Sequence, residues 1–263
     1  MPIVDLVADV GEGFGAYRHD TDRQLISSLT SANVACGFHA GDPRVMRRTV
    51  ERCSEAGVSV GAHPGFPDLV GFGRRAIECS EYEVYTDTLY QIGALAAFTR
   101  AQGVRLAHVS PHGRLGNLVQ TRHDYARAVA RAVADFDPEM IVLGFPGALP
   151  AEARRLGLTT AVTGFVDRSY RPDGSLTPRS EPHAVLHDPG EIAERAVRLV
   201  TEGKISTATG ADLELRADSI LLHGDNPSAA AIALRVRGAL GAAGVAVAPL
   251  TEVVRARGTT PTG

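Results

Sequence analysis

The chain has 263 residues, of which 44% are hydrophobic and 22% charged, proportions that are ordinary for a globular protein. A chain of this length buries enough surface to fold without disulfides or a structural metal, which excludes a disordered chain and a disulfide-stapled miniprotein. The formal net charge is −3 and the arginines are scattered, so we expect neither a nucleic-acid partner nor an acidic membrane partner.

Short β-rich segments alternate with longer helical patterns along the chain. We expect strands at residues 3–10, 32–36, 58–62, 105–110, 140–145, 159–165 and 219–222, with a further apolar run at 245–248. We expect helices near residues 21–30, 43–56, 80–102, 121–136, 147–156, 189–202 and 226–242. This alternation predicts an α/β protein with parallel strands, and seven or eight such units favour a closed β/α barrel over an open doubly wound sheet.

The chain shows no linker, low-complexity tract or repeat. We therefore expect a single domain over residues 1–263, with its core at about 3–250 and a disordered tail at 255–263. Two segments are unusual for barrel connections. Residues 168–187, rich in Pro, Gly, Ser and Arg, predict a lid or flap over an active site, and residues 203–217 predict a small polar hairpin.

Targeting signals and disulfide patterns are not visible. The first residues lack a basic region followed by an apolar run, and no stretch approaches the roughly 18 apolar residues of a membrane span. Cys36, Cys53 and Cys79 form no Cys-x-x-Cys pair, so we expect neither a disulfide framework nor a thiolate zinc site. These features predict a cytoplasmic protein.

Reactive side chains gather where the predicted strands end. In a parallel barrel all these ends lie on one face, so residues that are far apart in the sequence converge there. A single histidine at a strand end is more often a loop hydrogen-bonding residue than a catalyst, and Asp42 is expected to act at least partly as a helix cap. Because four histidines share this setting, each within two residues of a glycine, we favour a catalytic face. The strand-end residues are Asp9, Glu12, Asn33, Cys36, His39, Asp42, His63, Asp68, His112, Asp167, Arg168, His223 and Asp225.

A divalent metal is one candidate for this face. His39, His63 and His223, with a carboxylate such as Asp9 or Asp225, would supply the nitrogen and oxygen ligands of a catalytic metal. No tight motif such as His-Glu-x-x-His supports the assignment. We interpret the other histidines as structural or surface residues: His19, His108, His123, His183 and His187.

Motifs for nucleotides and nucleophiles are missing or weak. The single lysine, Lys204, lies outside any Gly-x-x-x-x-Gly-Lys-Ser/Thr pattern, so the chain has no phosphate loop. Residues 11–16 match the Gly-x-Gly-x-x-Ala dinucleotide pattern, but Glu12 would place a negative charge beside the pyrophosphate. Gly-x-Ser-x-Gly is absent, and Cys36, although close to His39 in the sequence, is more typical of a packing residue.

Several segments together point to one protein family. They are NVACGFHAGDP at 33–43, GAHPGFPD at 61–68, GFGRR at 71–75, QIGAL at 91–95 and HGD at 223–225. In this order, and over most of the chain, they closely resemble the LamB/YcsF family. The resemblance implies a β/α barrel similar to those of polysaccharide deacetylases and glycoside hydrolases. It also implies a 5-oxoprolinase activity, the ATP-dependent opening of 5-oxoproline to L-glutamate, in a complex with partner subunits B and C.

Hydrolysis of a lactam requires a general base and a proton donor, and four of these residues are candidates for these two roles. A carboxylate, Asp9 or Glu12, is the expected general base for the attacking water, and such a base needs hydrogen-bond reach to that water and a pKa raised toward neutrality. His63 or His112 is the expected proton donor to the departing ring nitrogen, because imidazole titrates near neutral pH. The resemblance places all four at positions that match the family pattern.

Substrate and ATP binding follow from the same resemblance. Arg168 or Arg179 is expected to bind the substrate carboxylate or a phosphate in a two-pronged grip. Because the chain lacks a phosphate loop, we expect ATP, with Mg²⁺, to be handled by subunits B and C. Further substrate-binding residues are expected at Asn33, His39, Asp42, Asp167, His223 and Asp225.

The chain departs from the family pattern at two places. Residues 5–12 read DLVADVGE where the family usually has DLNCDLGE. Arg114 and Gly116 stand where the family's PHGALYN has Ala and Tyr, so a hydroxyl is lost and a guanidinium is gained near His112. If the tyrosine contacts substrate, this change bears on which ring is opened.

Two alternatives from other classes stay open. One is a stand-alone metal-dependent amidohydrolase or deacetylase that acts on a small cyclic or acylated substrate. The other is a non-catalytic scaffold or carrier protein that holds the substrate for its partners. Metal analysis tests the first alternative, and replacement of His63 and His112 tests the second.

Overall fold

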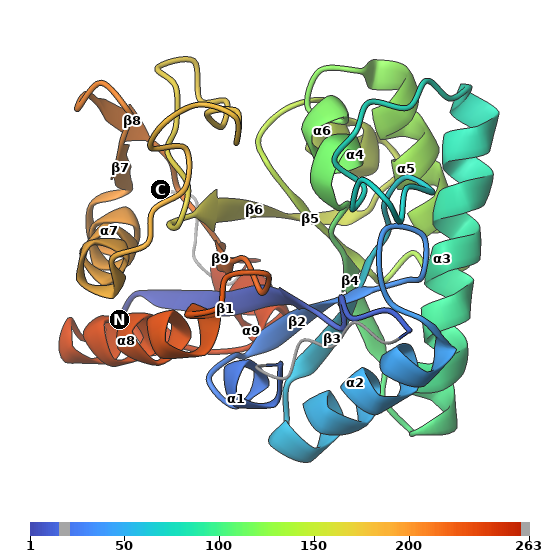
Figure 1. The fold of residues 1–263 in the computed structure, drawn as a ribbon, viewed down its shortest axis with the longest axis horizontal. Coiled ribbons are helices and arrows are strands. Elements are labelled where there is room, and N and C mark those ends of the chain that lie inside the picture. The colour runs from blue at the N-terminus through green and yellow to red at the C-terminus, as the bar shows by residue number, and fades with distance from the viewer. Residues whose placement is uncertain (16–21, 259–263) are drawn as a thin grey trace.

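The computed structural model describes residues 1–15 and 22–258. Within these residues, seven parallel strands form a barrel in the order β1-β2-β3-β4-β5-β6-β9, and pairing of β9 with β1 closes the ring (Figure 1). The predicted parallel barrel is therefore confirmed. Its strands are β1 (Ile3–Val10), β2 (Ser31–Ala35), β3 (Ser59–His63), β4 (Leu106–Val109), β5 (Ile141–Gly144), β6 (Thr159–Phe165) and β9 (Ser219–Leu222).

The predicted eighth strand, β10 (Ala246–Val247), lies outside the ring. It pairs with the first residues of β1, ahead of those that pair with β9. Leu250, which follows it, packs with Val7 inside the barrel, and the Leu250 N–H donates to Ser31 Oγ at 3.2 Å. The last elements of the chain therefore close the end of the barrel at which the strands begin.

Helices cover the outside of the ring. α3 packs on α5 and α7 packs on α8, and Figure 1 shows these two pairs on opposite sides of the barrel. No helix among the described residues is both long enough and apolar enough to cross a bilayer. The helices are α1 (Asp22–Ile26), α2 (Pro43–Ala56), α3 (Glu81–Ala101), α4 (Gly113–Leu118), α5 (His123–Phe136), α6 (Ala148–Arg155), α7 (Pro189–Glu202), α8 (Ala229–Ala242) and α9 (Leu250–Gly258).

Some helices differ from the predicted ones. α1 is shorter than the helix predicted at 21–30, and the short α4 and the C-terminal α9 were not predicted. α9 continues to Gly258, so the first residues of the predicted disordered tail are helical. They are held because Arg257 donates to an Asp218 carboxylate oxygen and to the Thr160 carbonyl, both at 2.8 Å. Residues 259–263 lie outside the described residues.

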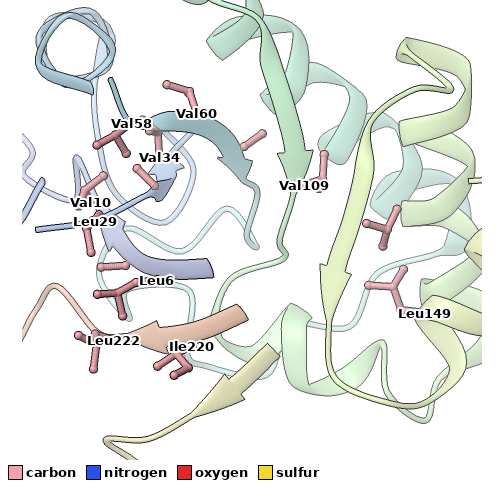
Figure 2. Close-up of a cluster of buried hydrophobic side chains, with 14 of the residues drawn as sticks. Leu6, Val10, Leu29, Val34, Val58, Val60, Val109, Leu149, Ile220 and Leu222 are labelled. Carbon is pink, nitrogen blue, oxygen red and sulfur yellow. The ribbon is translucent and has the colours of Figure 1, made fainter. Parts of the chain in front are cut away.

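Strand residues alternate between an outer and an inner core. On β1, Leu6 and Val10 point outward into the apolar cluster beneath the helices, part of which Figure 2 shows. Val7 and Asp9 point into the barrel, because successive side chains of a strand face opposite sides. The inner apolar layer is small, and the interior above it is polar. That layer consists of Val7, Ile141, Leu143, Ala161, Leu221 and Leu250.

The strand register aligns one polar layer inside the barrel. Asp9 pairs with Asn33, Asn33 with Gly61, and Gly61 with His108, across β1, β2, β3 and β4. Residues in register point the same way, so these four positions lie side by side in the interior. A Cβ at Gly61 would overlap the His108 ring, so glycine is what allows this imidazole to lie there.

The predicted hairpin at residues 203–217 is present between α7 and β9, and its first strand packs on α7. A bridge between Tyr170 and Thr207 fastens the neighbouring segment 168–187 to it. Arg168 ties that segment together by donating to two of its backbone carbonyls, at 3.0 and 2.6 Å. The two hairpin strands are β7 (Lys204–Ser206) and β8 (Asp212–Glu214).

Candidate active site

A cavity of about 440 Å³ lies at the C-terminal ends of the barrel strands. Its walls come from the ends of β1, β3, β4, β6 and β9, from α4, and from residues 175–179 of the inserted segment. Phe145 and Phe165 stack in one wall, with ring centroids 4.5 Å apart. The segment predicted to be a lid therefore contributes a wall of the cavity. The predicted site residues that line the cavity are Asp9, His63, His112, Arg168, Arg179 and His223.

Asp9 is oriented by hydrogen bonds that cross the polar layer. Asn33 donates its Nδ2–H to Asp9 Oδ1 at 2.9 Å, and His108 Nε2 donates to Asn33 Oδ1 at 2.8 Å. Asp9 Oδ1 also lies 3.3 Å from His63 Nε2. Burial alone would raise the pKa of Asp9, but the neighbouring imidazoles, His63 first, hold this pKa well below its usual range. Asp9 is therefore an ionised carboxylate with a fixed direction, and the raised pKa expected of a general base is not found at this residue.

His63 and His112 face each other at the floor of the cavity. His63 Nδ1 lies 2.6 Å from the Ser110 carbonyl oxygen, and His112 Nε2 lies 2.8 Å from that of Phe72. A carbonyl only accepts, so each ring carries its N–H on that side. The other nitrogens, His63 Nε2 and His112 Nδ1, are 2.9 Å apart. In neutral rings both present lone pairs, so a further proton or a cation is required between them.

Glu12 and His39 lie directly behind this pair. His39 Nε2 is 3.3 Å from Glu12 Oε1, His112 Nδ1 is 3.6 Å from the same oxygen, and the His39 and His112 rings stack with centroids 3.7 Å apart. Burial, and then the charges of Asp9 and Asp225, raise the pKa of Glu12 well above its usual range. Burial, with nearby cationic groups, lowers the pKa of both imidazoles.

These side chains form a candidate metal-binding group. The ligand atoms of Glu12, His39, His63 and His112 all lie within 4.8 Å of one another, and all four residues are buried. Three imidazoles and a carboxylate are donors that suit a transition metal. Of the predicted metal ligands His39, His63 and His223, only His39 and His63 belong to this group. His223 is outside this group, and His112 and Glu12 complete it.

Asp167 explains the position of His223. The backbone N–H and the Nδ1–H of His223 both donate to Asp167 Oδ2, at 2.9 Å each. Burial opposes ionisation of Asp167, but these bonds and the charge of His223 hold its pKa below the usual range. Asp167 therefore fixes the tautomer and the orientation of the His223 ring at the cavity wall, because the ring donates its Nδ1–H to this carboxylate.

Arginines form the charged side of the cavity. Arg74, which was not among the predicted site residues, donates from Nη2 to Asp225 Oδ2 at 2.8 Å and lies over the Phe72 ring, 4.7 Å from its centroid. Arg179 Nη2 is 4.0 Å from the other oxygen of Asp225. Asp225 therefore stands between two cavity arginines. Arg168 instead directs its Nε and Nη2 at backbone carbonyls of its own segment.

Arg114 and Gly116, which depart from the family pattern, both line the cavity. A Cβ at Gly116 would lie against the Pro111 carbonyl oxygen, so this turn of α4 requires glycine in the conformation seen. Among the described residues that line the cavity, Arg114 is a fourth arginine, against Asp9 as the single carboxylate. This imbalance of charge favours an anionic ligand.

Two strand-end residues have local roles away from the cavity lining. Asp42 Oδ1 accepts the backbone N–H groups of Arg44 and Val45, at 2.8 and 2.9 Å, and so caps α2. Cys36 is buried, and burial raises the pKa of its thiol to about 12. A thiol in this state is a poor nucleophile, which supports the interpretation of Cys36 as a packing residue.

Two residues of the site, Arg74 and His108, were not predicted from the sequence. Arg74 belongs to the GFGRR segment, which follows a predicted strand and so lies at the end of the barrel at which the strands finish. The place of this segment in the sequence could therefore have identified Arg74 as a site residue. His108 was interpreted as structural or surface, and it is a buried residue that supports Asn33 behind Asp9. The signal that could have identified His108 is the presence of a polar residue inside a predicted strand, where a core side chain is expected.

The fold and the cavity define a parallel β/α-barrel protein with an arginine-rich pocket at the ends of its strands. The model of the LamB/YcsF family matches residues 4–255, and the chain belongs to this family. The A subunit of 5-oxoprolinase from Brevibacillus brevis is 49% identical over 249 residues, 94% of this chain and 98% of that protein. The corresponding A subunit from Symbiobacterium thermophilum is 51% identical, over 93% and 94% of the two chains. The crystal structure of the lactam utilization protein from Thermus thermophilus is 46% identical and matches with a TM-score of 0.88, over 94% and 99% of the two chains.

Proposed function

We propose that this chain is the A subunit of a cytoplasmic, ATP-dependent 5-oxoprolinase, which opens the lactam of 5-oxoproline to give L-glutamate. The names of its relatives supply the substrate and the place in a complex. The observation that carries the proposal is the contact between Asp9 and His63 in a cavity also lined by Arg74 and Arg179. A base, a proton donor and an anion-binding group thus surround one space of suitable size for a small cyclic acid.

The substrate carboxylate is bound by the arginine side of the cavity. Arg74 and Arg179 flank Asp225, and each can direct further N–H groups at a carboxylate in charge-assisted hydrogen bonds. Of the two arginines expected from the sequence, Arg179 suits this role better, because Arg168 already holds backbone carbonyls. The ring of the substrate then lies toward the Phe145 and Phe165 wall and the reacting amide toward Asp9.

Ring opening needs activation, because an unstrained lactam is a poor electrophile and its closure competes with opening. Transfer of the ATP γ-phosphoryl group to the lactam oxygen makes the ring carbon open to attack. Water then adds to that carbon while Asp9 takes its proton, and His63 or His112 protonates the ring nitrogen as the C–N bond breaks. The resulting acyl phosphate reacts with a second water, which releases phosphate and L-glutamate.

ATP binding belongs to the partner subunits in this proposal. The chain has no phosphate loop, and its single lysine is Lys204 in the hairpin away from such a motif. We assign ATP, with Mg²⁺, to subunits B and C. This chain then supplies the pocket, the base and the proton donor for the activated ring.

The cluster of Glu12, His39, His63 and His112 favours one second candidate function. With a bound metal, the barrel would act as a stand-alone amidohydrolase or deacetylase on a small cyclic or acylated substrate. Such an enzyme needs neither ATP nor partner subunits, and this separates the two candidates.

The test follows ¹³C-labelled 5-oxoproline by NMR. The chain is assayed alone and with its two partner subunits, each with and without ATP. We expect labelled glutamate only when the partners and ATP are all present. Turnover by the chain alone without ATP would replace the proposal with the second candidate. If the complex assembles but no mixture forms labelled glutamate, the result would contradict 5-oxoproline as the substrate.

A further inference from the structure

Three imidazole nitrogens and one carboxylate converge at the floor of the cavity. We propose that Glu12, His39, His63 and His112 bind one divalent transition-metal ion of the zinc type, through His39 Nε2, His63 Nε2, His112 Nδ1 and a Glu12 oxygen. With the ion bound, His63 and His112 would be ligands, so the proton-donor role proposed above applies to the chain without the ion. The site is argued from geometry and does not rest on the proposed reaction.

Hydrogen-bond accounting is the first argument. His63 and His112 each donate their N–H to a backbone carbonyl, so lone pairs meet across the 2.9 Å between His63 Nε2 and His112 Nδ1. Asp9 Oδ1, 3.3 Å from His63 Nε2, is another acceptor there. Without an ion, a further proton is needed between the two rings. One cation at this position would satisfy both ring nitrogens together.

The distances fit a small coordination shell. Ligand atoms that bind a tetrahedral ion at 2.0–2.1 Å lie about 3.3 Å from one another. His63 Nε2 and His112 Nδ1 are 2.9 Å apart, His39 Nε2 and Glu12 Oε1 are 3.3 Å apart, and His112 Nδ1 and Glu12 Oε1 are 3.6 Å apart. These three separations bracket the tetrahedral value, and all the ligand atoms lie within 4.8 Å of one another, so side-chain adjustments would bring the four atoms into one coordination shell.

The surroundings also resemble those of a metal ligand set. A histidine ligand almost always donates its other ring N–H to a carbonyl or carboxylate, which fixes the tautomer. His63 does so to Ser110 and His112 to Phe72, at 2.6 and 2.8 Å. The ligands come from four separate segments that the barrel holds rigidly. His63 and His112 also line the cavity, so the ion would face the substrate space.

The donor types select the metal. Three nitrogens and one oxygen suit Zn²⁺ or Co²⁺, whereas Mg²⁺ and Ca²⁺ require shells made of oxygen. The four residues are only 1–6% exposed, so an ion held by them would be buried and not loosely bound at the surface. The ion would polarise a water or a substrate oxygen on the cavity side.

The test is metal binding by the full chain without substrate, ATP or partners, so its failure is separate from failure of the proposed function. The chain is stripped with a chelator and titrated with Zn²⁺, Co²⁺ and Mg²⁺. We expect one equivalent of Zn²⁺ or Co²⁺ per chain, a visible Co²⁺ absorption band of a low-coordinate site, and a raised melting temperature. Mg²⁺ should do none of these.

Variants locate the ion. Glu12→Gln and His112→Gln should each weaken Zn²⁺ binding by about ten- to hundredfold or more. The control His223→Gln should bind as the wild type does, because His223 is held by Asp167 outside the group. If His112→Gln does not fold, Glu12→Gln and the Co²⁺ spectrum decide. The proposal is overturned if no stoichiometric ion binds, or if Glu12→Gln binds as the wild type does. Loss of binding in His223→Gln would instead favour the set of His39, His63 and His223.

Discussion

Two carboxylates at the end of one strand are driven to opposite states by their neighbours. Asp9 accepts a hydrogen bond from Asn33 and faces His63, and its pKa is lowered. Glu12 is equally buried, but it lies beside Asp9 and Asp225, and its pKa is raised. The residue type alone does not separate a base from a ligand here. Separation comes from which partners the barrel places within a few ångströms.

Arg179 offers a direct test of anion binding. Arg179→Ala should lower kcat/KM for 5-oxoproline in the complete complex by about ten- to hundredfold, mainly through KM, because a charge-assisted bond to the substrate is lost. The control is Arg171→Ala in the same inserted segment, where Arg171 pairs with Glu181 outside the cavity lining. Steady-state kinetics should leave this control unchanged. Equal losses in both variants would assign the effect to the segment as a whole.

Asp5 predicts a pH-dependent stability. Thr30 and Ser219 donate to this buried carboxyl at 2.8 and 2.6 Å, yet burial raises its pKa from 3.8 to about 6. The folded state therefore binds the proton more tightly than the unfolded state does. Its stabilising contribution is complete below about pH 4 and is lost as the pH rises to about 6.

The measurement is the free energy of unfolding in urea from pH 4 to pH 7, for the wild type and Asp5→Asn. Relative to this variant, which cannot titrate, the wild type should lose roughly 3 kcal/mol over that range. Ser219 can rotate its hydroxyl to accept from the new amide, so the variant is expected to fold. Parallel pH profiles would show that Asp5 does not titrate in this way.

At the scale of elements, close approaches between strands shape the site. A Cβ at Gly224 would overlap the carbonyl oxygen of Asp9, so the loop after β9 reaches β1 only because this residue has no side chain. Gly61 plays a similar part between β2 and β4, where it leaves space for His108. The glycines beside the reactive residues are therefore packing requirements of the barrel interior.

Gly61→Ala tests this view of the polar layer. The added methyl would displace His108 and break its bond to Asn33, and overpacking of this kind costs about 1–3 kcal/mol. We expect lower stability in urea together with reduced turnover. Gly93→Ala, in α3 with open space around the new Cβ, should be neutral or stabilising by up to about 1 kcal/mol. Similar behaviour of the two variants would contradict the argument.

The sequence predicted the barrel because strand and helix periods alternate clearly, and parallel strands must end on one face. It therefore also predicted that residues such as Asp9, His63 and His112 lie together at this end of the barrel. It did not predict that His223 lies outside the metal-binding group, because its position depends on Asp167 from another strand end. Nor did it predict the support of Asn33 by His108, which depends on the register between strands. Local patterns contain neither kind of information.

At the scale of the whole molecule, the two ends of the barrel have different tasks. Leu250 and its apolar neighbours close the end at which strands begin. The other end holds the cavity, and residues 175–179 of the inserted segment form part of its wall. In the proposed function, this chain carries out the ring-opening half of the reaction in this cavity. This division requires that the chemistry at Asp9 be essential to the complex.

The most direct test compares complexes that contain the wild-type chain or Asp9→Asn. Conversion of 5-oxoproline to glutamate with ATP should fall by at least about a hundredfold in the variant, because the base for water is lost. The melting temperature of the chain should change little, since the new amide oxygen can still accept the Asn33 hydrogen bond. Turnover near the wild-type rate in a folded variant would contradict the assignment of lactam opening to this cavity.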